Sequence, residues 1–290
     1  MIKGLDNYVY LDEGSHRYFN RDGGEYMSVS KFRSLFKEPF NKGSAYNCAG
    51  KNEYVGMTAD EVLKQWEVYG KERADEGTRI HQAIELFFDT TTILPENEIY
   101  RPALLNIASK YKDYYRTYNE VILYDNESMV AGTADKPLVV SSAKDSIIDI
   151  TDWKTNIKGV HQVDLDKHGK RINKYMLHCL SHLVNSKYND YAIQLGIYAY
   201  MLQKKTGRKI GQLSIHYINP ENPLINYKIP VPYMLNDVKA MFDWYKHNRD
   251  SAPKIISTPA PKSVLSGFSN NDFLKDVSNV QCEPDEFDII

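Results

Sequence analysis

Acidic residues stand at the ends of two neighbouring segments whose composition predicts paired β-strands. Residues 146–151 are β-branched and apolar, which predicts a strand that continues through Asp152. Residues 137–140 predict a second strand, and the turn-like residues between the two segments predict a hairpin. In that hairpin Asp135 lies across from Asp152, so two carboxylates converge on one point.

The second of these strands also carries a lysine. Because successive side chains of a strand point to opposite faces, Asp152 and Lys154 share one face and Trp153 lies on the other. Converging carboxylates are typical of Mg²⁺ sites, and a nearby lysine can orient the water that attacks a phosphate. Taken alone, however, the pair favours a simpler interpretation, which is an exposed row of charges on an edge strand.

Apolar residues recur at helical spacing over residues 72–88 and predict a helix with one buried stripe. His81 and Glu85 lie four residues apart and therefore share a face beside that stripe. A single histidine next to an apolar face is more often structural than a metal ligand, so this helix alone favours a structural role. The converging carboxylates shift the balance towards a metal site.

Residues 191–203 are apolar nearly all round, which predicts a buried helix. Gln194 and Tyr198 would be polar groups on this core helix. The simplest role for them is ordinary hydrogen bonding inside the protein.

Four motifs in this order resemble those of the PD-(D/E)XK nuclease superfamily, and within it the RecB-type and phage-type exonuclease branch. They are Gly77-Thr78-Arg79-Ile80-His81 with Glu85, Gly132-Thr133-Ala134-Asp135, Asp152-Trp153-Lys154-Thr155, and Gln194-Leu195-Gly196-Ile197-Tyr198. The resemblance spans roughly residues 70 to 220. One position departs from it, because Ala134 stands where the proline of the superfamily name is expected.

The resemblance implies an α/β fold, in which a mixed central sheet of the restriction-endonuclease type is flanked by helices, with a helical N-terminal portion. It implies that Asp135 and Asp152 hold Mg²⁺ or Mn²⁺ and that either His81 or Glu85 completes the shell. Catalysis would fall to Lys154 together with the acids Asp135, Asp152 and Glu85. Gln194 and Tyr198 would brace the lysine strand or touch DNA.

A basic segment follows the lysine strand, within an insertion at about residues 156–188. The chain as a whole has a formal net charge of −2, so binding to DNA would depend on such a local concentration of charge. A solvated surface loop would explain the same residues, but their place beside the site favours phosphate contacts. The basic residues expected to bind DNA are Lys158, Lys167, Lys170, Arg171 and Lys174.

Length and composition set the domain organisation. The 290 residues predict one nuclease domain over residues 1–250, followed by a flexible acidic tail over residues 251–290 that could recruit a replication or recombination protein. Three scattered cysteines fall short of the four thiolates that an iron-sulfur cluster commonly needs. With no membrane span and no signal peptide in the sequence, we expect a cytoplasmic protein, in the host cytoplasm if a phage encodes it.

These observations favour a metal-dependent DNA exonuclease of phage or mobile-element recombination, repair or replication. Two alternatives remain open. The same core also supports structure-specific endonucleases and junction resolvases, and a nuclease-like DNA-binding subunit need not cleave at all. Retention of Asp135, Asp152 and Lys154 together argues against the non-catalytic alternative.

Overall fold

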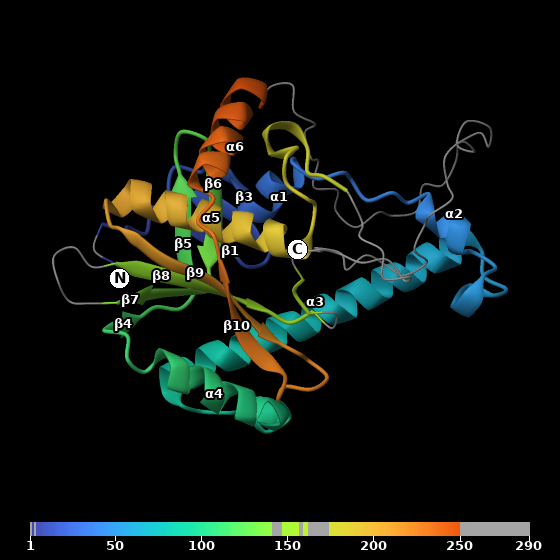
Figure 1. The fold of residues 1–290 in the computed structure, drawn as a ribbon, viewed down its shortest axis with the longest axis horizontal. Coiled ribbons are helices and arrows are strands. Elements are labelled where there is room, and N and C mark those ends of the chain that lie inside the picture. The colour runs from blue at the N-terminus through green and yellow to red at the C-terminus, as the bar shows by residue number, and fades with distance from the viewer. Residues whose placement is uncertain (1, 3, 141–146, 157–158, 162–173, 250–290) are drawn as a thin grey trace.

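The computed structural model describes residues 2, 4–140, 147–156, 159–161 and 174–249, and they form two five-stranded mixed sheets flanked by helices (Figure 1). This is the α/β class that the sequence predicts, although the strands divide between two sheets where a single central sheet was expected. The first sheet has the order β1-β2-β3-β6-β5 and the second has the order β10-β9-β8-β7-β4. Each contains one parallel pair, β3 with β6 and β8 with β9.

The strands of the first sheet are β1 (Val9–Asp12), β2 (Arg17–Asn20), β3 (Glu25–Ser28), β5 (Val121–Asp125) and β6 (Val130–Ala134). Those of the second sheet are β4 (Arg116–Thr117), β7 (Lys136–Val139), β8 (Ile148–Lys154), β9 (Ile210–Ile218) and β10 (Asn226–Val231). The α-helices are α1 (Val29–Ser34), α2 (Ser44–Cys48), α3 (Ala59–Thr90), α4 (Arg101–Tyr111), α5 (Lys187–Thr206) and α6 (Leu235–Asn248). Short 3-10 turns occur at Asn52–Tyr54, Pro95–Tyr100 and His178–Leu180.

Between β6 and β7 the chain passes from the first sheet to the second at a single residue. Strand β6 ends at Ala134 and β7 begins at Lys136, so Asp135 belongs to neither strand. The predicted hairpin of β7 and β8 is confirmed, with Lys136 opposite Thr151. This register brings Asp135 beside Asp152, as the sequence predicts.

Strand β8 lies inside its sheet, between β7 and β9. Six of its seven residues are buried, and Lys154 at the end is partly buried. The interpretation of Asp152 and Lys154 as an exposed row on an edge strand is therefore wrong. Strands covered on both faces are typically rich in β-branched and apolar residues, which explains the composition of β8.

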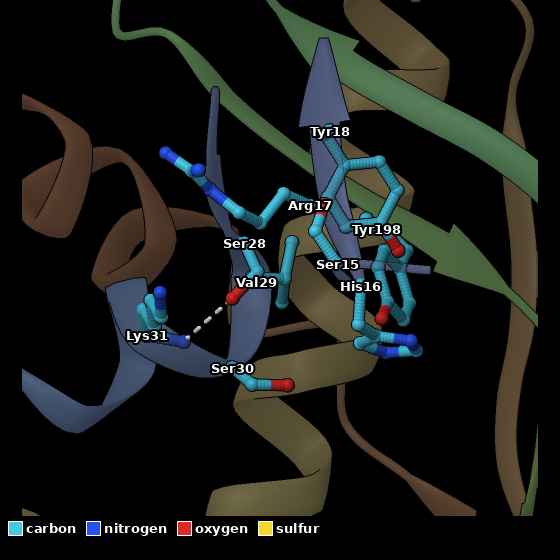
Figure 2. Close-up of a pocket in the computed structure, with 10 residues that line it drawn as sticks. Ser15, His16, Arg17, Tyr18, Ser28, Val29, Ser30, Lys31 and Tyr198 are labelled. Carbon is cyan, nitrogen blue, oxygen red and sulfur yellow. Dashed lines mark hydrogen bonds between the residues drawn. The ribbon is translucent and has the colours of Figure 1, made fainter. Parts of the chain in front are cut away.

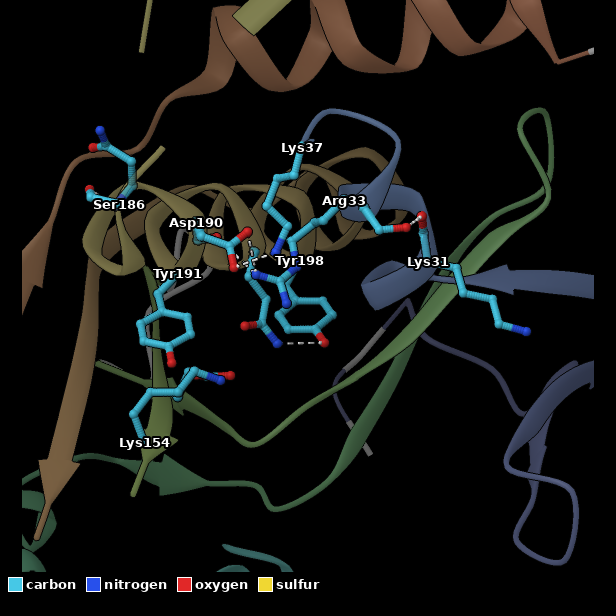
Figure 3. Close-up of polar contacts among 12 residues, drawn as sticks. Lys31, Arg33, Lys37, Lys154, Ser186, Asp190, Tyr191 and Tyr198 are labelled. Carbon is cyan, nitrogen blue, oxygen red and sulfur yellow. Dashed lines mark hydrogen bonds and ion pairs between the residues drawn. The ribbon is translucent and has the colours of Figure 1, made fainter. Parts of the chain in front are cut away.

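Helix α5 is the central helix of the fold. It packs against strands of both sheets and against α1 and α6, which is why twelve of its residues are buried. Its N-terminal end is tied to α1 by a buried ion pair, in which Arg33 Nη1 lies 2.8 Å from Asp190 Oδ1, and Lys37 Nζ lies 3.0 Å from the other carboxylate oxygen (Figure 3). Asp190 is only 3% exposed, so the cations of Arg33 and Lys37 compensate a charge that burial alone would destabilise.

Helix α3 is one continuous helix of 32 residues, so it begins well before the segment over residues 72–88 that the sequence predicts. It starts at a capping box, in which Thr58 and Glu61 bond reciprocally. Gly70, buried near the middle, does not interrupt it. Its first turns pack on α2 around a small separate cluster that includes Trp66 and Tyr54, away from the sheets (Figure 1).

The chain begins with a hairpin of β1 and β2, and a third strand, β3, joins it before the helices begin. Helix α4 ends at Tyr111, and Arg116–Thr117 pairs with β7. Within the described ranges, no helix combines the length and apolar character needed to cross a membrane. The tail at residues 251–290 lies outside the described residues.

Candidate metal centre

Three potential metal ligands from distant parts of the sequence meet at the junction of the two sheets. One ligand atom from each of His81, Glu120 and Asp135 lies within 4.8 Å of the other two. His81 comes from α3, Glu120 precedes β5, and Asp135 stands between β6 and β7. Two carboxylates and an imidazole form a donor set that suits a divalent cation.

Asp135 is held by the strand across from it. The backbone N–H of Trp153 donates to Asp135 Oδ2 over 2.8 Å, and His81 Nδ1 lies 3.7 Å from the same oxygen. Burial, then the nearby Asp152 and Glu120, raise the pKa of Asp135 well above its ordinary value. Acidic groups crowded in this way are stabilised as anions when a cation lies between them.

Glu120 is the member of the cluster that the sequence analysis did not identify. Its backbone is in the left-handed region, with φ of 47°, and its N–H donates to the carbonyl oxygen of Asp135 over 3.1 Å. The residue is exposed, yet its carboxyl lies among other acids. Loss of solvent around the carboxyl, then Glu85 and Asp152, raise the pKa of Glu120 to about 7.

His81 is neutral at physiological pH. Burial and the charge of Lys154 lower its pKa to about 4, against the opposing effect of Asp152. A neutral imidazole has a lone pair available for a metal ion, which a protonated one lacks. This histidine is therefore prepared to act as a ligand.

Asp152 and Lys154 form an ion pair beside the cluster. Lys154 Nζ lies 2.7 Å from Asp152 Oδ2, and it also stands over the ring of Tyr191 at 4.6 Å from the ring centroid (Figure 3). Burial opposes the charge of Lys154, but Asp152, Tyr191 and Asp135 outweigh it and raise the pKa above its ordinary value. Lys154 is accordingly a fixed cation rather than a proton acceptor.

Of the acids that the sequence analysis placed in the site, only Asp135 belongs to the three-residue cluster. Asp152 approaches Lys154, although its charge also acts on Asp135, Glu120 and His81. Glu85 is half-buried one turn after His81 on α3, and its negative charge contributes to the raised pKa of Glu120. Burial and then Asp89 raise the pKa of Glu85, while Lys136 lowers it.

Gly132 and Thr133 of the Gly132–Asp135 motif make different contacts. A Cβ on Gly132 would stand 2.7 Å from Val29 Cγ2 and 2.9 Å from Tyr198 Cε1, so only glycine lets α1 and α5 approach β6 this closely. The Thr133 and Tyr18 hydroxyls are 2.9 Å apart. The motif thus packs the first sheet on α5 just before it presents Asp135.

Gln194 and Tyr198 are buried together on α5. The Gln194 side-chain amide donates to the Tyr198 hydroxyl over 3.4 Å. Burial, and then the charge of Asp152, raise the pKa of Tyr198 well above its ordinary value, which places this ring near the acids. Both residues support the site from the core.

A cavity of about 170 Å³ is lined in part by Tyr198 and Gly132 (Figure 2). Side chains from the turn between β1 and β2 and from the start of α1 surround it, and most of them are hydroxyls or bases. They are Ser15, His16, Arg17, Ser28, Ser30 and Lys31.

Few of the residues expected to bind DNA fall in the described part of the chain. Lys158, Lys167, Lys170 and Arg171 lie outside it. Lys174 is described and exposed, and its carbonyl oxygen accepts a backbone hydrogen bond from Asn185 over 2.8 Å.

Neither known family models nor curated proteins match this chain. Among solved structures, it is similar to a "Putative exonuclease" from Eubacterium rectale, with 13% identity, a TM-score of 0.34, and coverage of 78% of this chain and 79% of the other. It is also similar to the protein SSO0001, with 14% identity, a TM-score of 0.25, and coverage of 60% and 72% respectively. Both scores are low, so the function proposed below rests on the geometry of the site.

Proposed function

We propose that this chain is a metal-dependent nuclease that hydrolyses phosphodiester bonds in DNA with Mg²⁺ or Mn²⁺. The observation that carries the proposal is the meeting of His81, Glu120 and Asp135 beside the Asp152–Lys154 pair. These groups combine a divalent-cation donor set with a fixed ammonium group at one place. That combination suits the hydrolysis of a phosphodiester.

The donor set fits such a cation on electrostatic grounds. Burial and the charge of Asp152 raise the pKa of both Asp135 and Glu120, and Glu120 adds to the effect on Asp135, so negative charge is destabilised here when no cation is bound. A bound divalent ion supplies Lewis acidity towards the phosphate and lowers the pKa of water. His81, Glu120 and Asp135 would hold it, with Asp152 within electrostatic reach.

Lys154 and the side chains around it would position the reacting groups. Lys154 remains cationic in this environment, so it would hold the attacking water or stabilise the charge that grows on the phosphate. Asp152 fixes the ammonium group by the 2.7 Å ion pair, and the Tyr191 ring confines it from the other side. Gln194 and Tyr198 support this arrangement from α5.

The cavity beside Tyr198 is a suitable place for a phosphate group of the DNA strand. Lys31 supplies positive charge and the serine hydroxyls supply hydrogen-bond donors, while Arg17 at the cavity is already paired with Glu25. The basic residues Lys158, Lys167, Lys170, Arg171 and Lys174 would extend this surface. We propose an exonuclease of DNA recombination, repair or replication that acts in the cytoplasm, without an iron-sulfur cluster, and whose acidic tail recruits a protein partner.

One gel experiment tests both the activity and whether it is that of an exonuclease or an endonuclease. End-labelled linear duplex, end-labelled single strand and closed circular DNA are incubated with the full chain in EDTA, Mg²⁺ or Mn²⁺. We expect shortening of linear DNA with either metal and no reaction in EDTA. Cleavage of the circle would favour the endonuclease alternative, and binding without cleavage of any substrate would favour the non-catalytic one.

A further inference from the structure

A buried lysine stands next to the candidate metal ligand Asp135. Lys136 is 0% exposed, and its ammonium group lies 3.6 Å from the centroid of the Phe88 ring. This residue belongs to none of the four sequence motifs. An apolar side chain would fill the same space against Phe88 without the cost of burying a charge, so the ammonium group needs a polar explanation.

The ammonium group of Lys136 donates to a side chain that precedes Glu120. It bonds Asn119 Oδ1, and the Asn119 amide donates in turn to Asp89 Oδ1 over 2.6 Å. Asn119 is thereby fixed from both sides, by β7 and by the end of α3. This links three elements through one amide group.

The backbone around Asn119 follows β7 closely. Tyr118 N–H donates to the carbonyl oxygen of Pro137 over 2.9 Å, and Glu120 N–H donates to that of Asp135 over 3.1 Å. Between these two bonds the side chain of Asn119 is the only link that the described structure adds towards Lys136. The segment therefore has backbone anchors at both ends and a side-chain anchor in the middle.

Glu120 needs these anchors because its backbone is strained. A φ of 47° is in the left-handed region, which non-glycine residues rarely adopt unless their surroundings impose it. Releasing Asn119 would let the segment relax to an ordinary conformation and turn the Glu120 carboxylate away from His81 and Asp135. The cluster would then lose one of its three ligands.

We propose that Lys136 is a positioning residue that acts through Asn119 to hold Glu120 in the metal cluster. This inference rests on the proposed metal-dependent function and adds to it a determinant of metal affinity. Lys136 itself touches neither metal nor substrate. Its loss should weaken metal binding rather than the chemical step.

The test measures Mn²⁺ binding to the full chain by calorimetry, independently of activity. Lys136→Met should weaken Mn²⁺ binding by about 10- to 100-fold, which is the usual effect of removing a group that orients a ligand. Cleavage should recover to near the wild-type rate at saturating Mn²⁺, so that the metal KM changes and kcat does not. Asn119→Ala should have the same effect, and Asn119 is only half-buried, which keeps this variant foldable.

A double-mutant cycle makes the test specific. In the Glu120→Gln background, Lys136→Met should weaken Mn²⁺ binding little further, because the residue that it positions has already lost its charge. Lys204→Met is the control, since it removes a lysine with a close polar partner remote from Glu120, with Nζ 2.6 Å from Asp125 Oδ1 at the far end of β5. Its Mn²⁺ affinity should equal that of the wild type.

Two results would overturn the inference, and they differ from failure of the proposed function. Wild-type Mn²⁺ affinity in both Lys136→Met and Asn119→Ala would reduce Lys136 to a structural residue, even if both variants melt at lower temperature. Equal losses from Lys136→Met with and without Glu120→Gln would show that Glu120 does not mediate the effect. A wild-type chain that binds no Mn²⁺ would instead remove the proposed function, and this inference with it.

Discussion

The backbone N–H of Trp153 donates to the Asp135 carboxylate over 2.8 Å, and this bond joins the end of one sheet to the interior of the other. Asp135 is the residue at which the chain leaves the first sheet, while Trp153 lies in β8 between the two charged residues of the second. The side chain of Trp153 packs against α3 and α4, with Phe88 and Tyr111 beside it. The candidate metal ligand is thus fixed by the hydrophobic packing on the opposite face of the strand.

Replacement of Asp135 or Asp152 by asparagine should abolish cleavage without unfolding the protein. In Asp135→Asn the side-chain oxygen can still accept from Trp153, and the repulsion that raises the pKa of Asp135 disappears. We expect metal-free thermal stability equal to or above that of the wild type, and no cleavage above background. Asp152→Asn should also be inactive. Asp243→Asn, an exposed acid on α6, serves as the control, and wild-type cleavage by Asp135→Asn would refute the site.

Removal of the ammonium group should separate catalysis from metal binding. Lys154→Met should lower kcat by about 10²-fold or more, because a preorganised cation at a reacting phosphate contributes on this scale. Mn²⁺ binding should persist, since the lysine is not a ligand. Calorimetry and single-turnover cleavage measure the two effects. Lys246→Met, which removes a half-exposed lysine paired with Glu127, should change neither, and loss of Mn²⁺ binding in Lys154→Met would contradict the assignment.

The contribution of Glu120 to the stability of the metal-free protein should fall as the pH rises from about 4.5 to about 7, whereas His81, whose pKa is lowered to about 4, acts in the opposite direction over part of this window. The pKa of Glu120 is about 7 in the folded protein against an ordinary 4.5, so in this window the folded state holds the proton more tightly than the unfolded state. The stabilisation by that proton is complete below pH 4.5 and is lost once the pH passes 7.

Urea denaturation in EDTA at several pH values measures this dependence. The difference in unfolding free energy between wild type and Glu120→Gln should shift in favour of the variant as the pH rises. A difference that stays constant over the window would show that Glu120 is not destabilised as an anion. In the absence of EDTA, added Mn²⁺ should restore the unfolding free energy of the wild type above pH 7.

A single methyl group at Gly132 should disturb both fold and site. Its Cβ would come within 3 Å of Val29 and Tyr198, and overpacking of this kind typically costs about 1–3 kcal/mol. Gly132→Ala should therefore lower the free energy of unfolding and the cleavage rate together. Gly14→Ala is the matched control, because a Cβ there meets nothing within 4 Å. Equal stability of the two variants would mean that the close approach to α5 is not required.

The cation-lined cavity can be tested through salt dependence. Lys31→Ser should weaken DNA binding and reduce the slope of log affinity against log salt by about one unit if one phosphate contact is lost. Replacing Lys167, Lys170, Arg171 and Lys174 by serine should reduce the slope further. Turnover at saturating DNA should change less than affinity. An unchanged slope in Lys31→Ser would exclude the cavity from the DNA-binding surface.

The sequence carried the local part of the site but not the long-range part. Alternation along β8 and the composition of the hairpin were enough to bring Asp135 and Asp152 together, because both effects depend on neighbours in the chain. Glu120 could not be found in this way. The position of Glu120 depends on the pairing of β5 with β6, which places Glu120 across from Asp135. It also depends on a left-handed backbone conformation that no local sequence pattern predicts.

A signal for Glu120 was nevertheless present. An acid stands directly before the apolar run at residues 121–124, and antiparallel pairing of that run with residues 131–134 would have brought the acid to Asp135. The division into two sheets was harder to foresee, since the change occurs within one residue at Asp135. Helix α3 runs through the buried Gly70 and is therefore longer than the segment over residues 72–88 that apolar spacing predicts.

The length of α3 connects the candidate metal cluster with a part of the protein that lies far from it. About 22 Å of helix separates Trp66 in the outlying cluster from His81 at the site, on the usual rise of 1.5 Å per residue. A tilt of about 5° around the His81 end would move Trp66 by about 2 Å over that lever arm. A molecule bound at the outlying cluster would thus be connected to the His81 imidazole through one continuous helix, and a tilt of α3 at that end would change the angle at which the helix presents His81.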